Sequence, residues 1–411
     1  MALTLTVHRA TDQIGGNCIE LQSGDARLVL DVGRPLDAPN DARGLIPTTL
    51  DLTKPATILI SHPHQDHYGL LDEAPPDWPV RCGEPTRRLM ALTAGLTGRT
   101  LPQTFNSWRT GTRFEIGPFS VTPMLTDHSA FDAHMLLLQA HGRTILYSGD
   151  FRRHGRKAAL VDRLMAKPPK VDVLLMEGTN LGSDKPCVTE ADLEERFVTL
   201  LRKTAGRVFV AWSAQNIDRT VSLYRACLKT GRTLVVDLYT AEVMAMLAEF
   251  GRLPEPGWSR IKVVMTAGLR RRYGSDEGNA FASQMAKVGM SASALERNAD
   301  RLVIITRRSL MRDFIRKGVK PTTNDAWCWS QWRGYLDNPE GSAIKGWFEA
   351  GGAHAEHIHT SGHASVSDLR AFASAIDPKT LVPIHGVKWD EAQAGFPSIT
   401  RLRDGEPLEI S

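Results

Sequence analysis

The sequence predicts an α/β protein whose character changes along the chain. Residues 3–178 contain short apolar segments separated by Gly and Asp, which is typical of β-strands joined by turns. After Gly182, helix-like and strand-like segments alternate as far as about residue 357, and this alternation indicates a parallel sheet. The remaining residues contain one more helix-like and one more strand-like segment.

The composition is that of an ordinary globular protein of two to three domains, with 411 residues, 42% hydrophobic and 23% charged. Lys and Arg (50) nearly balance Asp and Glu (46), so the net charge of +4 neither requires nor excludes a polyanionic partner. The five cysteines are widely spaced and form no CxxC pair, which favours a reducing, cytoplasmic location. No apolar run approaches the roughly 20 residues of a membrane helix, so we expect no membrane association.

The first part of the chain contains eight segments that predict strands. Each one is apolar or alternating and ends at a turn residue. The segments cover residues 3–7, 17–22, 26–33, 57–61, 119–124, 133–140, 143–150 and 171–178.

The middle of the chain predicts helices between strands. Residues 189–206 have Thr189 as an N-cap and apolar side chains on one face, and they end at Gly206. Residues 219–231 and 241–251 follow the same pattern, and residues 207–212, 232–239, 261–265 and 301–306 predict strands between or after them. A last helix is expected at residues 365–376 and a last strand at residues 380–386.

The segment "SHPHQDHYG" concentrates imidazoles and a carboxylate where a predicted strand ends. Side chains two apart on an extended segment point to the same side, so His62 and His64 can hold one ion together. Asp66 and His67 follow where the chain turns, and they can reach a second ion. Imidazole and carboxylate ligands without thiolate suit zinc, or alternatively manganese, in a hydrolytic site.

The "HPHQDH" motif resembles the HxHxDH motif of the metallo-β-lactamase superfamily, whose fold is an αββα sandwich. The resemblance implies further metal ligands at His128, in "TDHSAFD", at Asp150, in "ILYSGDF", and at His385, in "VPIHG". It also implies that Asp31, in "LVLDVG", supports these ligands without binding the ions itself. The expected cofactor is a pair of divalent ions.

The residues beyond "LLMEGTN" narrow the resemblance to the β-CASP nucleases, which include RNase J. Glu177 matches the acidic residue of their first additional motif, His363 in "HTSGHAS" matches the second, and His385 matches the third. The resemblance implies that residues 186–357 form an inserted β-CASP α/β domain, while residues 1–185 and 358–411 form the metallo-β-lactamase domain. A histidine in the third motif accompanies members that cut RNA, whereas DNA-cutting relatives usually carry valine.

Several residues are candidates for the chemistry of phosphodiester cleavage. Asp66 is expected to orient or deprotonate the attacking water, and His363, paired with Glu177, to act as an acid or to hold phosphate. The backbone around Ser361, Gly362 and His363 is a candidate phosphate nest. Further candidates for binding the phosphate groups of RNA are Ser213, Asn216 and Arg219. For Arg219, an ordinary position on the first turn of a helix is an equally good interpretation.

The resulting hypothesis is a metal-dependent ribonuclease, cutting from the end or internally, that acts on single-stranded RNA. DNA is the alternative nucleic acid, and a homodimer is possible from the sequence. The competing hypotheses are a small-molecule hydrolase of the same fold, acting on an ester or a signalling nucleotide, and a non-catalytic RNA-binding subunit.

Overall fold

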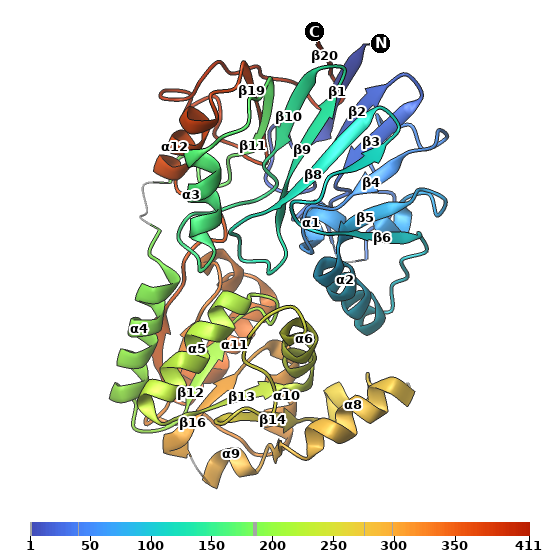
Figure 1. The fold of residues 1–411 in the computed structure, drawn as a ribbon. Coiled ribbons are helices and arrows are strands. Elements are labelled where there is room, and N and C mark those ends of the chain that lie inside the picture. Colours follow the sequence, from blue (N-terminus) through green and yellow to red (C-terminus); the bar gives the residue numbers. More distant parts are fainter. Residues whose placement is uncertain (1, 40, 184–186, 275, 298) are drawn as a thin grey trace. The chain divides into compact units, whose positions relative to one another are not determined.

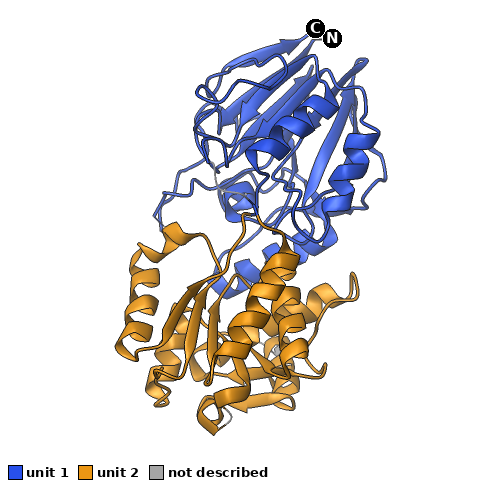
Figure 2. Ribbon diagram, turned by 90° about the vertical axis from the view of Figure 1, so that its left-hand side faces the viewer, with its two compact units in different colours: residues 1–187, 362–411 blue, residues 188–361 orange. Residues whose placement is uncertain are grey.

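The computed structural model describes residues 2–39, 41–183, 187–274, 276–297 and 299–411. They divide into two compact units (Figure 2): unit 1 comprises residues 1–187 and 362–411, and unit 2 comprises residues 188–361. The predicted α/β class is confirmed by sheets and helices in both units. The predicted boundary between residues 185 and 186 lies outside the described residues.

Unit 1 is built on two sheets (Figure 1). The first sheet contains, in spatial order, β20 (Pro407–Ile410), β1 (Leu3–Arg9), β2 (Cys18–Ser23), β3 (Ala26–Leu30), β4 (Thr57–Leu59), β5 (Val80–Gly83) and β6 (Phe105–Trp108). The second contains β19 (Thr380–Ile384), β11 (Val173–Glu177), β10 (Arg143–Tyr147), β9 (His134–Ala140), β8 (Phe119–Leu125) and β7 (Phe114–Ile116).

The inner faces of these two sheets share one apolar core. Leu5 and Leu30 from the first sheet belong to the same buried cluster as Val121, Leu138 and Val382 from the second. Side chains at every second position of a strand point to the same face, so this packing uses the alternation visible in the sequence. The two sheets therefore form the central layers of the unit.

Helices cover the outer faces of both sheets. Two helices, α1 (Gln65–Tyr68) and α2 (Glu84–Thr97), contribute Tyr68 and Met90 to a cluster on the first sheet. Two others, α3 (Ala158–Ala166) and α12 (Val366–Ile376), contribute Val161 and Phe372 to a cluster on the second sheet. The result is the four-layered αββα sandwich expected from the sequence.

Unit 2 contains one parallel sheet, as predicted from the alternation of helices and strands. Its strands are, in spatial order, β15 (Gly289–Ser291), β14 (Ile261–Met265), β13 (Thr233–Asp237), β16 (Leu302–Ile305), β12 (Val208–Ala211), β17 (Ala326–Trp329) and β18 (His354–His357). Its helices are α4 (Glu190–Lys203), α5 (Ile217–Thr230), α6 (Leu238–Ala248), α7 (Ala267–Arg270), α8 (Asp276–Ala286), α9 (Ala294–Arg297), α10 (Arg308–Arg316) and α11 (Pro339–Ala350).

The start of α4 agrees with the sequence prediction. The Thr189 hydroxyl accepts a hydrogen bond from the backbone N–H of Asp192, and the Asp192 carboxylate accepts one from the backbone N–H of Thr189. This capping box satisfies two N–H groups that the helix itself leaves unpaired. Across the described part of the chain, no helix combines the length and apolar character needed to span a membrane.

Candidate metal centre

The histidine-rich segment follows β4 and turns directly into α1. His64 occupies the N-cap position in an extended conformation, and Asp66 lies in the first turn of the helix. The imidazoles of His62 and His64 point to the same side, with His62 Nε2 3.1 Å from His64 Nδ1. His62 and His67 are fully buried. The local spacing therefore produces the clustering that it predicts.

The distant members of the site follow neighbouring parallel strands. Asp150, Glu177 and His385 lie at or just beyond the ends of β10, β11 and β19, which pair side by side in parallel. Because the carboxyl ends of parallel strands meet at one edge of a sheet, residues more than 200 positions apart in sequence (385 − 150 = 235) become neighbours. His128 follows β8 and is likewise fully buried.

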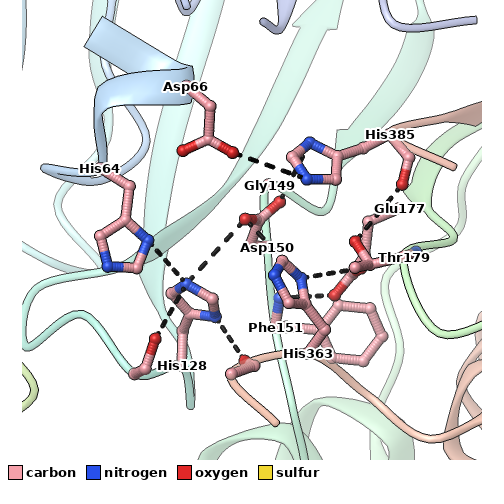
Figure 3. A network of polar contacts seen from close by, with 12 residues as sticks. His64, Asp66, His128, Gly149, Asp150, Phe151, Glu177, Thr179, His363 and His385 are labelled. Carbon is pink, nitrogen blue, oxygen red and sulfur yellow. Dashed lines mark hydrogen bonds and ion pairs between the residues drawn. The ribbon is translucent and has the colours of Figure 1, made fainter. Parts of the chain in front are cut away.

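The ligand-type side chains form three overlapping groups, and Figure 3 shows the members around Asp150 other than His62 and His67. Within each group, one nitrogen or oxygen atom per residue lies within 4.8 Å of the others. Asp150 belongs to every group, and its Oδ2 lies 3.1 Å from His67 Nε2 and 3.7 Å from His363 Nδ1. The first group is His62, His64, His128 and Asp150; the second is Asp66, His67, Asp150 and His385; the third is Asp150, Glu177 and His363.

The electrostatics of the cluster keep most of its imidazoles neutral. Burial lowers the pKa of His62 and His128 well below the usual value, and the positive charge of neighbouring imidazoles adds to this effect. Burial also lowers the pKa of His64 and His385. A neutral imidazole retains the lone pair that a metal ion requires.

Asp150 and His67 form a buried ion pair. Burial alone would raise the pKa of Asp150, but His385, His67 and His363 hold it well below the usual range. Burial alone would lower the pKa of His67, but Asp150, Asp31 and Asp66 raise it well above the usual value. The Asp150 carboxylate is therefore ionised and offers anionic oxygen ligands. A cation bound at His67 would displace a proton from its imidazole.

These residues fit divalent metal ions. His385 Nε2 and Asp150 Oδ1 are buried without a hydrogen-bond partner among the described residues. A buried polar atom without a partner is costly, and a bound cation would satisfy both. The donor set of imidazole nitrogens and carboxylate oxygens, without sulfur, suits zinc or manganese.

Asp31 belongs to none of the three groups but holds His67 through a hydrogen bond. Its carboxylate accepts hydrogen bonds from the backbone N–H and hydroxyl of Ser61, from Nδ1 of His67 at 2.7 Å and from the hydroxyl of Tyr147 at 2.6 Å. The backbone of Asp31 adopts a left-handed conformation, with φ at 60°. Such strained backbone persists where its surroundings enforce it, which is common at functional sites. No sequence pattern indicates this role for Tyr147, because a buried tyrosine in a strand resembles an ordinary core residue.

Glu177 and His363 form the third group with Asp150. His363 Nδ1 lies 3.1 Å from Glu177 Oε2, and Glu177 also accepts hydrogen bonds from the backbone N–H groups of Phe151 and Thr179. Burial would lower the pKa of His363, but Glu177 and Asp150 raise it to about 9. The structure thus brings this pair against the carboxylate that the other two groups share.

Gly362 is constrained by the same site. Its carbonyl accepts a hydrogen bond of 2.6 Å from Nδ1 of His128, which leaves His128 Nε2 facing His64. A Cβ atom at Gly362 would lie 2.7 Å from Ser129 Oγ and 3.3 Å from His128 Cε1, so a side chain does not fit without rearrangement. Ser361, the other member of the predicted phosphate nest, is the last residue of unit 2.

The candidate phosphate ligands around α5 all lie in unit 2. Ser213 is exposed after β12, and the Asn216 side chain caps α5 by accepting from the backbone N–H of Arg219. The prediction for Arg219 is wrong. Its fully buried guanidinium binds the Glu190 carboxylate and the carbonyl of Ser330. An enclosed and paired arginine cannot reach a phosphate, so Arg219 stabilises unit 2 instead.

We predict that Asp150→Ala lowers the affinity for divalent ions more than any other single substitution in the cluster, because all three groups contain Asp150. Removal of a residue that only supports a metal ligand lowers metal affinity by about 10- to 100-fold. Removal of the shared ligand Asp150 should lower it by about 100-fold or more. Metal content after dialysis against a buffered zinc solution measures it. Asp162→Ala, which removes a half-exposed carboxylate in α3, is the matched control. Equal metal content in both variants would contradict the prediction.

We predict that Arg219→Ala lowers the free energy of unfolding by about 3–5 kcal/mol, because Glu190 would remain buried and unpaired. Arg225→Ala, on the same helix, removes an exposed guanidinium 3.7 Å from Glu194 and should cost less than about 1 kcal/mol. Urea unfolding followed by tryptophan fluorescence compares the two. If both variants unfold at the same urea concentration, the buried pair does not have the role described.

Comparisons with known proteins agree with this fold and site. A family model described as "Beta-lactamase superfamily domain" matches residues 35–214, and one described as "Zn-dependent metallo-hydrolase RNA specificity domain" matches residues 352–393. A Ribonuclease J from Sinorhizobium meliloti is 23% identical over 86% of this chain, and one from Helicobacter pylori is 25% identical over 97%. A solved structure of a protein of unknown function from Enterococcus faecalis matches at TM-score 0.82, with 19% identity and full coverage of both chains.

The chain spans about 60% of the length of these curated relatives, 63% for the first and 59% for the second. The two matched segments include every member of the three ligand groups. Asp31, which belongs to none of these groups, lies just before the first matched segment. The fold, the ordered motifs and the relatives agree with one another. Residues 35–214 thus match a β-lactamase superfamily domain, and the chain as a whole is similar to the RNase J-like β-CASP proteins.

Proposed function

We propose that this protein is a metal-dependent hydrolase that cleaves phosphodiester bonds in RNA. One observation carries the proposal. Asp150 belongs to both groups of candidate metal ligands and also to the group that contains Glu177 and His363. Relatives named Ribonuclease J and the match to an RNA specificity domain, which includes His363 and His385, support RNA as the substrate. Single-stranded RNA is the form we propose, with DNA as the alternative.

The proposed cofactor is a pair of zinc ions, one in each of the first two groups, with manganese as the alternative. Bound divalent ions would lower the pKa of water and neutralise charge on the phosphate. In the first group, His62, His64 and His128 would hold one ion. In the second, Asp66, His67 and His385 would hold the other, and Asp150 would join both groups.

The accessible side chains of the cluster indicate the side from which substrate approaches. Asp66 is 13% exposed and His363 is 20% exposed, whereas the side chains of His62, His67 and Asp150 are 0–1% exposed. His64 is also partly exposed, so a substrate phosphate would approach from the side of His64, Asp66 and His363. We assign to the Asp66 carboxylate the role of orienting the attacking water.

His363 is the group we assign to the leaving oxygen or to a phosphate oxygen. Glu177 accepts from Nδ1 of His363 and thereby fixes the ring. Glu177 is itself held by two backbone N–H groups, so the pair is rigid. Oriented general acids contribute about 10²- to 10⁴-fold to rate.

The cytoplasmic location and the absence of a membrane partner remain predictions from the sequence. All five cysteines are unpaired, and four of them are buried, which supports a reducing compartment. Whether two copies assemble is a separate prediction that gel filtration tests.

We predict that purified protein cleaves labelled single-stranded RNA with zinc or manganese and loses activity with chelator. His363→Ala should lower kcat by about 10²-fold or more, since it removes an oriented proton donor, while bound metal changes little. Asp66→Ala should lower both activity and metal content. Denaturing gels with RNA labelled at either end also separate trimming from internal cleavage.

His354→Ala is the matched control, because His354 is 68% exposed on β18 and pairs only with Glu356 at 3.2 Å among the described residues. It should leave activity unchanged. Cleavage of DNA alone, or turnover of small esters alone, would contradict RNA as substrate. Full metal occupancy without any cleavage would favour a non-catalytic RNA-binding role.

A further inference from the structure

Asn17 lies in unit 1, directly before the first residue of β2. Its side chain is fully buried beside the second ligand group. Its Oδ1 accepts a hydrogen bond of 2.7 Å from Nδ1 of His385. That bond leaves Nε2 as the nitrogen of His385 that faces the site, and this atom has no hydrogen-bond partner among the described residues. Asn17 thus selects the ring nitrogen that His385 presents.

The orientation of the Asn17 amide follows from its neighbours. The Asp31 carboxylate is an acceptor, so the Tyr147 hydroxyl, 2.6 Å from Asp31 Oδ2, must donate to it. The Tyr147 oxygen then accepts from Asn17 Nδ2 at 3.1 Å. With Nδ2 directed to Tyr147, Oδ1 of Asn17 must face His385. The assignment therefore rests on a complete set of donors and acceptors.

The same chain of hydrogen bonds reaches His67. Asp31 accepts from Nδ1 of His67 at 2.7 Å, which leaves His67 Nε2 facing Asp150 at 3.1 Å. Tyr147 thus links Asp31, the hydrogen-bond partner of His67, to Asn17, the hydrogen-bond partner of His385. Both histidines belong to the second group.

The main chain of Asn17 contacts a third member of that group. Its N–H donates to the carbonyl of Asp66 at 3.1 Å, and its carbonyl accepts from Gly33 N–H at 2.8 Å. A Cβ atom at Gly33 would lie 1.8 Å from the backbone carbonyl oxygen of Asp66, so only glycine allows this close packing. His385 also adopts a left-handed backbone conformation, at φ 50°, which its surroundings must enforce.

We infer that Asn17 and Tyr147 are positioning residues that set the ring nitrogens of His385 and His67 and orient the second group toward one divalent ion. Neither side chain hydrogen-bonds His62, His64 or His128 within the described part of the chain. The first group therefore does not depend directly on them. The inference rests on the proposed metal binding, and its effect is confined to one of the two ions.

The test is zinc titration of chelator-treated protein in competition with a chromophoric chelator, with cobalt absorption spectra as a second readout. We expect wild-type protein to bind two ions. Asn17→Ala should weaken one of them by about 10- to 100-fold, the usual cost of losing a partner that orients a ligand, and leave the other within about twofold. Tyr147→Phe, which keeps the ring, should weaken the same ion by a smaller factor.

The controls remove comparable groups from unit 2. Tyr224→Phe deletes a buried hydroxyl that donates to the carbonyl of Ser259, and Asn338→Ala deletes the side-chain cap of α11. Both should leave the two zinc affinities unchanged. If Asn17→Ala fails to fold, Tyr147→Phe alone decides.

The possible outcomes separate this inference from the proposed function. No zinc uptake by wild-type protein would overturn both. Two unchanged affinities in Tyr147→Phe and in folded Asn17→Ala would overturn only the positioning role. Equal weakening of both ions, with a lower Tm for the metal-free protein, would also overturn it, because Asn17 would then act only on the fold.

Discussion

The structure of the site depends on one buried carboxylate, Asp150. An ionised carboxylate without solvent is unfavourable unless positive groups or donors surround it. Here imidazoles approach it from several directions, and most of them are themselves buried and neutral. The cluster is therefore a set of groups that the protein holds together at a cost in free energy. Divalent cations are the partners that would offset this cost.

The fold brings these groups together through the ends of its strands. Three parallel neighbours in the second sheet supply Asp150, Glu177 and His385, while β3 and β4 of the first sheet lead to Asp31 and His62. The apolar core between the sheets fixes the separation of these strand ends. Backbone strain at Asp31 and His385 shows where position is enforced against local preference.

The sequence predicts the parts of this arrangement that depend on local pattern. Alternating apolar residues predict the longer strands, and the spacing of His62 and His64 predicts their shared direction. Short strands such as β5, β7 and β15 escape prediction, because three or four residues carry too little periodicity. The distant residues Asp150 and His385 are identified through family motifs, since no local pattern links them.

The remaining differences arise from tertiary contacts. Arg219 has the sequence position of a surface residue, but Glu190 on α4 draws it into the interior of unit 2. Asn17 is the first residue of a predicted strand, and only the folded chain reveals its contacts with His385 and Tyr147. Both roles depend on partners far away in sequence, which a single sequence does not reveal.

X-ray absorption at the zinc edge of the purified, zinc-loaded protein shows whether Asp150 and the surrounding imidazoles bind a pair of ions. We expect nitrogen and oxygen neighbours at about 2.0–2.2 Å, no sulfur at about 2.3 Å, and a second metal at about 3.5–4 Å. A sulfur shell, or protein that retains no zinc, would contradict it.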